Sequence, residues 1–297
     1  MILHSRAETE QSGMRLDDGL QSLFPELSKG RIRKIIEWGG CSVGQAMVRV
    51  ASRTVREGEE VSLGIMEPER YVDLHLAPTD ILYEDADYVA VNKGAGINSQ
   101  RTPYQLKGTL EHAVSLLFCE QGNREPVRVV HRLDRGTSGV MIFPKTKRAA
   151  THISYLFKEG KVEKLYWAIV GDRPDVDEWS LDAPIAKLNK FRYGVALPGK
   201  PAKTLFRVLV HGERATLIEA RPQTGRTHQI RVHLAHCKMP IIGDAAYGGL
   251  AAQRMMLHSH AISFKAEGGR LIQAVAPVDK AFAEICNSYG IALPLNP

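Results

Sequence analysis

The chain has 297 residues, of which 44% are hydrophobic and 24% are charged. This length allows a sizeable buried core, and the composition is that of an ordinary globular protein rather than a disordered one. No stretch is apolar enough to span a bilayer, and the opening segment MILHSRAETEQSGMR lacks the apolar run of a secretion signal. We therefore expect a cytoplasmic protein without membrane attachment.

The formal net charge of +6 is concentrated in one short window of the sequence. Between Ser28 and Arg56 there are seven basic residues against one acidic residue, Glu37, so this window accounts for the whole excess. The basic residues are Lys29, Arg31, Arg33, Lys34, Arg49, Arg53 and Arg56. A cationic module attached to a nearly neutral body suggests that the module binds a polyanion and the body carries the chemistry.

The first clear element in chain order lies inside this window. LSKGRIRKIIEWGG predicts a short helix with Ser28 as its N-cap and Gly39 or Gly40 at its end. The buried face would consist of Ile32, Ile35 and Ile36, and the solvated faces would carry Arg31, Arg33 and Lys34. The segment that follows alternates and breaks at Gly44 and Gly58, which is typical of short strands joined by tight turns.

The next segment, EPERYVDLHLAPT at residues 67–79, contains two prolines and no helical period. It predicts a linker. We therefore expect a small basic domain at residues 14–65, a linker at 66–79 and a larger domain at 80–290.

In the larger domain, strand-like runs alternate irregularly with helical ones. ILYEDADYVAVNKGAGI predicts two strands, GTLEHAVSLLFCEQG predicts a helix, and VRVV and VMIF predict strands on either side of the loop HRLDRGTSG. KLYWAIVG predicts a strand, TLFRVLVHGERATLIEARP a hairpin, and TGRTHQIRVHLAHCKMP a helix that ends before Pro240. This order favours an α+β fold with a mixed, largely antiparallel sheet.

The loop HRLDRGTSG places one carboxylate, Asp134, between Arg132 and Arg135. These cations would favour the ionised carboxylate, which could then act as a nucleophile or a base. An isolated aspartate in such a loop is more often a salt-bridged turn residue. The loop by itself leaves both interpretations open.

Several longer motifs follow one another along the chain: VNKGAG, HRLDRGTSG, EKLYWAIVG, TGRTHQIRVHLAH, PIIGDAAYGG and MMLHSHAISF, which extend over about Ile81 to Phe264. In this order they resemble the motifs of the RluA family of pseudouridine synthases, which act on large-subunit ribosomal RNA and transfer RNA. HRLDRGTSG resembles the catalytic-loop signature of that family. Residues 14–63 resemble the small α/β RNA-binding domain, named after a ribosomal small-subunit protein, that precedes the catalytic domain in many of these enzymes.

This resemblance implies an isomerase. Uridine in RNA is detached at its N1 glycosidic bond, the base is rotated, and C5 is joined to C1′ of the same ribose. The reaction is redox-neutral, so we expect no metal and no cofactor. The resemblance implies RNA as the partner, with large-subunit ribosomal RNA favoured and transfer RNA as the alternative. We expect a monomer.

The resemblance also implies roles for individual residues. Asp134 matches the essential aspartate, and a carboxylate suits cleavage of a glycosidic bond because positive charge develops on the sugar. Tyr166, two residues after Lys164, matches the tyrosine that stacks on the target base. Arg226 matches the arginine that pairs with the catalytic carboxylate.

Two further residues are implied at the RNA itself. Arg132 matches the arginine that enters the RNA stack when the target uridine is flipped out, and contact with phosphate alone is its alternative. Leu257 would form an aliphatic wall behind the base, or would be an ordinary core residue. In the basic domain, Arg31, Arg33 and Lys34 would contact phosphates.

Other interpretations remain open. A zinc site could be assembled from histidines and one cysteine, but no paired-cysteine or His-Glu-x-x-His spacing supports it. These candidates are His228, His233, His236, Cys237, His258 and His260. A non-catalytic RNA-binding or ribosome-assembly protein would have no chemical reason to keep the aspartate, tyrosine and arginine together, and a base exchanger would need a second carboxylate.

The sequence departs from the family pattern in four places. Gly94 replaces a usual proline, Asn98 to Gln100 replace residues that include histidine and proline, and Ser259 replaces a usual alanine. CSVGQ also lacks the Val-Asn-Gly turn typical of the N-terminal domain. These departures affect the choice of RNA target rather than the expected catalytic positions.

Overall fold

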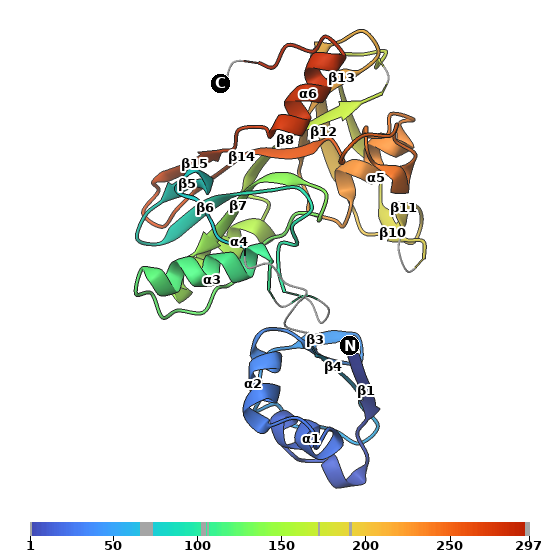
Figure 1. Cartoon of the computed structure of the whole chain (residues 1–297). Coiled ribbons are helices and arrows are strands. Elements are labelled where there is room, and N and C mark those ends of the chain that lie inside the picture. The colour runs from blue at the N-terminus through green and yellow to red at the C-terminus, as the bar shows by residue number, and fades with distance from the viewer. Residues whose placement is uncertain are drawn as a thin grey trace. The chain divides into compact units, whose positions relative to one another are not determined.

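The computed structural model describes residues 2–65, 74–101, 105, 107–171, 173–189 and 192–294 (Figure 1). The chain divides into two compact units. The first comprises Met1–Leu76 and Asn98–Gly122, and the second comprises Ala77–Ile97 and Asn123–Pro297. Among the described residues, no helix combines the length and the apolarity needed to cross a membrane.

The first unit contains a four-stranded antiparallel sheet and two helices that pack on it. The strand order is β1-β4-β2-β3. The elements are β1 (Ile2–Arg6), α1 (Leu16–Leu23), α2 (Lys29–Glu37), β2 (Cys41–Val43), β3 (Ala46–Val48) and β4 (Glu60–Gly64), with a 3-10 turn η1 at Thr9–Gln11. The predicted small α/β domain is thus present as a fold.

Helix α2 forms as its sequence predicts. The Ser28 hydroxyl accepts a hydrogen bond from the backbone N–H of Arg31, which satisfies one free donor of the first turn. The three isoleucines at helical spacing are buried, and each contributes about 2 kcal/mol of hydrophobic stabilisation. Gly39 ends the helix with a left-handed φ of 78°, a conformation that glycine adopts without strain.

Helix α3 (Leu110–Glu120) groups with the first unit although it follows later in the chain. Its buried Glu111 accepts hydrogen bonds from the Nη2 of Arg49 at 2.9 Å and from the backbone N–H of Arg101 at 2.9 Å. The expected ranges therefore differ from the structure: 14–65 omits strand β1, and 80–290 includes α3. Residues 66–73 of the expected linker lie outside the described residues.

The second unit is built on a nine-stranded sheet with the order β5-β6-β7-β14-β8-β13-β12-β9, in which β15 also pairs with β14. Its strands are β5 (Ile81–Glu84), β6 (Tyr88–Lys93), β7 (Ser138–Pro144), β8 (Glu163–Val170), β9 (Glu178–Asp182), β12 (Lys203–His211), β13 (Thr216–Pro222), β14 (Leu257–Lys265) and β15 (Leu271–Val275). Only the pairing of β7 with β14 is parallel. The expected α+β fold with a largely antiparallel sheet is confirmed.

The remaining elements of this unit lie outside the sheet. They are η3 (Pro78–Asp80), α4 (Lys147–Lys158), the small hairpin β10 (Ile185–Lys187) and β11 (Tyr193–Val195), α5 (Gln229–His236), η4 (Ala245–Tyr247) and α6 (Lys280–Ser288). Helix α4 packs on β7 through Ile153 and its neighbours, while Phe282 of α6 is buried against the half of the sheet that contains β8 and β13. Figure 1 shows α6 lying beside these strands.

Strand β14 meets β7 so closely that a glycine is required. At Gly139, φ is +109°, and a Cβ atom would lie 2.1 Å from the backbone oxygen of Ser259. No other residue fits there without moving one of the two strands. This glycine therefore allows the loop that precedes β7 and the start of β14 to meet.

Two element predictions are wrong. VRVV, residues 127–130, is not a strand, because both edges of β7 are already occupied by β6 and β14. Residues 224–228 are not helical, because His228 adopts a left-handed φ of 57° and α5 begins only at Gln229. The other expected strands and helices are present.

Candidate functional site

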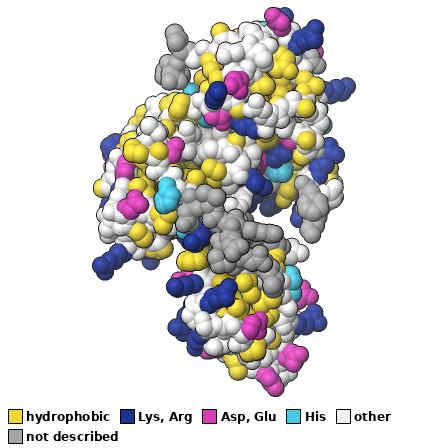
Figure 2. All heavy atoms as spheres, in the orientation of Figure 1, with side chains coloured by type: hydrophobic (Ala, Val, Ile, Leu, Met, Phe, Trp, Pro, Cys, Tyr) yellow, Lys and Arg dark blue, Asp and Glu magenta, His cyan; other side chains and the backbone are white. Residues whose placement is uncertain are grey.

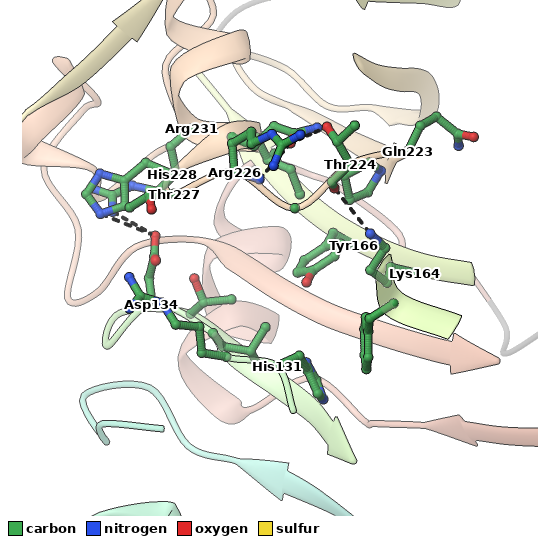
Figure 3. Close-up of a pocket in the computed structure, with 18 of the residues that line it drawn as sticks. His131, Asp134, Lys164, Tyr166, Gln223, Thr224, Arg226, Thr227, His228 and Arg231 are labelled. Carbon is green, nitrogen blue, oxygen red and sulfur yellow. Dashed lines mark hydrogen bonds and ion pairs between the residues drawn. The ribbon is translucent and has the colours of Figure 1, made fainter. Parts of the chain in front are cut away.

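A cavity of about 670 Å³ opens in the second unit. It is lined by the loop that precedes β7, by the start of β8, by the segment from Pro222 to Arg231, and by Leu257 at the beginning of β14. Asp134, Tyr166, Arg226, Arg132 and Leu257 all line it, so segments far apart in sequence bring the five expected residues of this domain to one place. Figure 3 shows this pocket in close-up.

The loop that carries Asp134 is fixed by its own backbone and by a second loop. The carbonyl of Asp134 accepts from the N–H of Thr137 at 3.0 Å, which closes a turn. The carbonyl of Arg135 accepts from the N–H of Gly96 at 2.7 Å, and the Nε of Arg135 donates to the Gly96 carbonyl at 2.9 Å. The backbone that carries the Asp134 carboxylate is therefore held in place by hydrogen bonds within its own loop and to the loop at Gly96.

The side chain of Lys93 contacts both of these loops and is fully buried. Its Nζ donates to the carbonyls of Gly94 at 3.0 Å, Ile97 at 2.9 Å and Arg135 at 3.4 Å. Burial lowers the pKa of Lys93 to about 7, although the nearby Asp134 raises it. The amine thus holds the two loops together as a buried hydrogen-bond donor.

The carboxylate of Asp134 pairs with Arg231 rather than with Arg226. The Nη1 of Arg231 donates to Oδ2 of Asp134 at 2.9 Å, and the Nε2 of His228 lies 3.7 Å from the same oxygen. Arg231 also donates to both oxygens of the buried Asp244, at 2.7 and 2.9 Å. Burial lowers the pKa of Arg231, but the two carboxylates raise it by more, so the guanidinium remains charged.

The expected pairing of Arg226 with Asp134 is therefore wrong. Arg226 is exposed, and its Nε donates to the carbonyl of Pro201 at 2.9 Å. It lies in the loop before α5, whereas Arg231 is on the first turn of that helix and faces Asp134. Two arginines stand close together in TGRTHQIR, and spacing alone does not tell which one faces inward.

Tyr166 lines the pocket from β8, opposite Ser259 of β14 in the antiparallel register. Burial raises the pKa of Tyr166 to about 12, and Asp134 also acts to raise it, while a hydrogen bond with Ser259 acts to lower it. The phenol is therefore protonated at neutral pH. Ser259, one of the departures from the family pattern, contacts a candidate site residue directly.

The loop from Thr224 to His228 is held by the buried side chain of Gln229. The Oε1 of Gln229 accepts from the hydroxyl of Thr224 at 2.7 Å and from the backbone N–H of Arg226 at 3.0 Å. The Nζ of Lys164 donates to the Thr224 carbonyl at 3.2 Å, and burial lowers the pKa of this lysine to about 8. Figure 3 shows Lys164 reaching from β8 toward Thr224.

Three of the histidines weighed as zinc ligands have other partners in the structure. His228 bonds to the Tyr247 hydroxyl, His233 to Thr204 and the Ala183 carbonyl, and His258 to Ser138 and the Ala276 carbonyl. Within the described ranges, no three His, Cys, Asp or Glu side chains are grouped as metal ligands. The four cysteines, Cys41, Cys119, Cys237 and Cys286, are free, and two of them, Cys41 and Cys286, are buried.

The basic residues of the first unit are more compensated than the sequence suggests. Figure 2 shows acidic side chains among the basic ones on this unit. Four of the seven cations of the basic window pair with acids from outside it: Arg33 with Asp17, Lys29 with Asp18, Arg49 with Glu111 and Arg53 with Glu59. Arg31 and Lys34 are exposed on α2, and no ion pair to them is found among the described residues.

Comparison with known proteins agrees with this fold. The family model of RNA pseudouridylate synthase matches residues 87–236. A protein of Aquifex aeolicus described as an uncharacterized RNA pseudouridine synthase is 36% identical, over 83% of this chain and 80% of its own length. Ribosomal large subunit pseudouridine synthase D of Vibrio parahaemolyticus is 34% identical, over 84% and 78%.

A solved structure supports the same fold. Human RNA pseudouridylate synthase domain containing 4 superposes with a TM-score of 0.62 at 24% identity and covers 72% of this chain and 94% of its own. The family match over residues 87–236 and the two relatives above show that the chain belongs to the RluA family of RNA pseudouridine synthases, isomerases that act on RNA, as its motifs predict.

Proposed function

We propose that this enzyme converts uridines of large-subunit ribosomal RNA to pseudouridine in the cytoplasm, with Asp134 as the reacting carboxylate. The observation that carries the proposal is the Asp134 side chain, held by Arg231 on a rigid loop at a cavity of about 670 Å³. Several relatives named ribosomal large subunit pseudouridine synthase D, such as that of Vibrio parahaemolyticus, favour this class of RNA.

The proposed chemistry follows from the charge of the site. Cleavage of the glycosidic bond develops positive charge at C1′, and a carboxylate placed beside it stabilises or captures that cation. The Arg231 guanidinium donates to Oδ2 of Asp134 and orients the carboxylate at the moment of reaction. The reaction exchanges no electrons with an outside group, so the proposal invokes no redox cofactor.

The base itself must leave the RNA helix before it can enter the cavity. Tyr166 provides an aromatic face and Leu257 an aliphatic wall, and the cavity volume lies in the range of small-ligand pockets. Arg132 is exposed at the rim, where a planar guanidinium can take the place of the extruded base. Arg226, also exposed at the rim, is available to contact a phosphate.

The first unit would contribute RNA affinity rather than chemistry. Arg31 and Lys34 project from α2 without acidic partners in the described part of the chain, whereas Arg33 is engaged by Asp17. We therefore assign phosphate contact to Arg31 and Lys34 and a mainly structural role to Arg33.

The proposal is tested by the nearly isosteric variant Asp134→Asn. Large-subunit ribosomal RNA transcribed with [5-³H]uridine releases tritium when pseudouridine forms, because C5 loses its hydrogen. Wild-type protein should release tritium, and Asp134→Asn should release none while binding the same RNA with nearly unchanged affinity. Product formation at the wild-type rate by Asp134→Asn would refute the role of Asp134.

The RNA target is identified separately by mapping pseudouridines in total RNA from cells with and without the gene. We expect the sites that disappear to lie in large-subunit ribosomal RNA. Disappearance confined to transfer RNA would refute this target while leaving the reaction intact.

A further inference from the structure

His228 adopts a backbone conformation that a side chain rarely accepts. Its φ is 57° and its ψ is 20°, and among the described residues the only other non-glycine residue with a positive φ is Lys238. The left-handed conformation costs about 1 kcal/mol or more for a residue with a Cβ atom. The contacts of the His228 side chain therefore have to stabilise this backbone conformation.

The ring of His228 lies between Tyr247 and Asp134. Its Nδ1 lies 2.9 Å from the hydroxyl of Tyr247, and its Nε2 lies 3.7 Å from Oδ2 of Asp134. Figure 3 shows the ring turned toward the Asp134 carboxylate. A separation of 3.7 Å leaves no room for a water molecule between the two groups.

We assign the proton on this ring from the partners of Tyr247. The Tyr247 oxygen accepts a hydrogen bond from the backbone N–H of Tyr193 at 3.2 Å, which leaves its own O–H free to donate to Nδ1 of His228. Nδ1 is then an acceptor, and in the neutral ring the proton is on Nε2. The N–H of the imidazole is thus directed at Oδ2 of Asp134.

Both groups that approach the carboxylate approach the same oxygen. Arg231 donates to Oδ2 at 2.9 Å, and His228 faces Oδ2 as well. Among the described residues, no donor side chain is found on Oδ1. Oδ1 is therefore the oxygen left for the substrate.

We propose that His228 is a positioning residue that, with its proton fixed on Nε2 by Tyr247, holds Oδ2 of Asp134 so that Oδ1 is the reacting oxygen. This inference rests on the proposed function, because it presumes that Asp134 reacts. It adds that the orientation of Asp134 depends on two side chains, one cationic and one neutral.

The charges around His228 are compatible with a neutral ring. Burial of the ring lowers its pKa most, Arg231 and Arg132 lower it as well, and Asp134 and Asp244 raise it. The aromatic rings of Tyr193 and Tyr247 pack edge-on against it, with centroids at 5.6 and 5.7 Å. A neutral imidazole accepts from Tyr247 with Nδ1 and directs its Nε2–H at Oδ2 of Asp134, 3.7 Å away, whereas imidazolium has no acceptor for the Tyr247 O–H.

The test uses substitutions that tolerate the left-handed backbone. Asparagine adopts this conformation readily and can still accept from Tyr247, but it does not reach Asp134. Glycine adopts it freely and leaves a space for added imidazole. Tritium release from the same [5-³H]uridine-labelled ribosomal RNA is measured for wild type, His228→Asn, His228→Gly and Tyr247→Phe, each with and without imidazole.

We expect His228→Asn to lower kcat by about tenfold to a hundredfold, the usual effect of a misplaced reacting group, with KM nearly unchanged. Tyr247→Phe keeps the ring packed on Arg231 and should lower kcat about fivefold. Imidazole should restore His228→Gly but not His228→Asn, and the rescue should increase with pH as imidazole becomes neutral. His236→Asn, exposed at the end of α5, is the matched control.

The outcomes separate the inference from the proposed function. If wild type is active and Asp134→Asn is inactive, but His228→Asn keeps the wild-type kcat, the positioning role is wrong and the proposed function stands. Rescue that follows imidazolium instead of imidazole would overturn the proton assignment.

Discussion

Arg231 donates to Asp134 at 2.9 Å although the two residues are 97 positions apart in the chain. The same guanidinium binds both oxygens of the buried Asp244, so it serves two carboxylates at once. The orientation of Asp134 thus depends on a bridge that only a planar, five-donor side chain can make. Asp244 acts on the site through Arg231 without touching the cavity.

The first prediction compares the two arginines of this segment. Arg231→Lys should lower kcat by at least about a hundredfold, because an ammonium group cannot bind Asp134 and Asp244 together. Arg226→Lys should leave kcat almost unchanged and mainly raise KM, since Arg226 is exposed at the rim. Steady-state tritium release gives both constants, and urea denaturation checks that the variants are folded. Equal decreases of kcat in both variants would contradict the assignment.

The second prediction concerns two glycines that follow Asp134, one in its loop and one in strand β7. Gly139→Ala should destabilise the protein by about 3 kcal/mol or more, because its Cβ would overlap the Ser259 backbone at a positive φ. Gly136→Ala is the matched control, because its Cβ would only make ordinary contact with Met255 at 3.5 Å. Urea midpoints measure the difference. Equal stability of the two variants would show that β7 and β14 can separate without cost.

The third prediction is a loss of stability in mild acid. Burial lowers the pKa of His258 to about 4 and that of His131 to about 3, whereas both titrate near 6.5 in the unfolded chain. Below pH 6.5 the unfolded state therefore binds protons that the native state does not. The free energy of unfolding should fall between pH 6.5 and pH 4 by up to about 1.4 kcal/mol per pH unit for each histidine.

His258→Gln should reduce this slope, since glutamine can still donate to the Ala276 carbonyl but does not titrate. Urea denaturation at several pH values measures the slope, and the exposed His236→Gln serves as the control. A slope that His258→Gln leaves unchanged would assign the acid sensitivity to other groups.

The fourth prediction separates binding from structure on α2. Changing Arg31 and Lys34 to glutamine should weaken RNA binding. The slope of the logarithm of the binding constant against the logarithm of the salt concentration should become less steep by about 0.7 to 0.9 for each phosphate that the protein no longer neutralises. Arg33→Gln should instead destabilise the unit. Burial would raise the pKa of Asp17, but Arg15 and Arg33 together lower it to about 2, and Arg33 provides one of these two interactions. RNA titrations at several salt concentrations and urea denaturation distinguish the two effects.

Much of this architecture can be predicted from local patterns. The cap and apolar spacing of α2, the strands β6 and β8, and the hairpin of β12 and β13 follow from short-range chemistry that the sequence displays. The cluster of Asp134, Tyr166 and Leu257 follows from motif resemblance. The local patterns can be interpreted without the location of a distant residue, whereas the cluster can be predicted only because the motifs resemble those of a known family.

The errors arise where a distant segment decides the local outcome. VRVV has the composition of a strand, but β14 occupies the edge of β7 that it would need. Arg231, not Arg226, is the partner of Asp134, because the left-handed conformation of His228 makes α5 begin only at Gln229. The His228 side chain in turn bonds to Tyr247, which lies in another segment of the chain. The compensation of the basic window by Asp17, Asp18, Glu59 and Glu111 is likewise invisible to a local count of charge.

The position of β14 also has a consequence for synthesis of the chain. This strand lies between β7 and β8, yet it leaves the ribosome long after both of them. Until it arrives, β7 and β8 each have an unpaired edge, and the two parts of the sheet that carry Asp134 and Tyr166 are not joined. A nascent chain arrested before residue 257 would therefore expose aggregation-prone edges and would require protection by a chaperone.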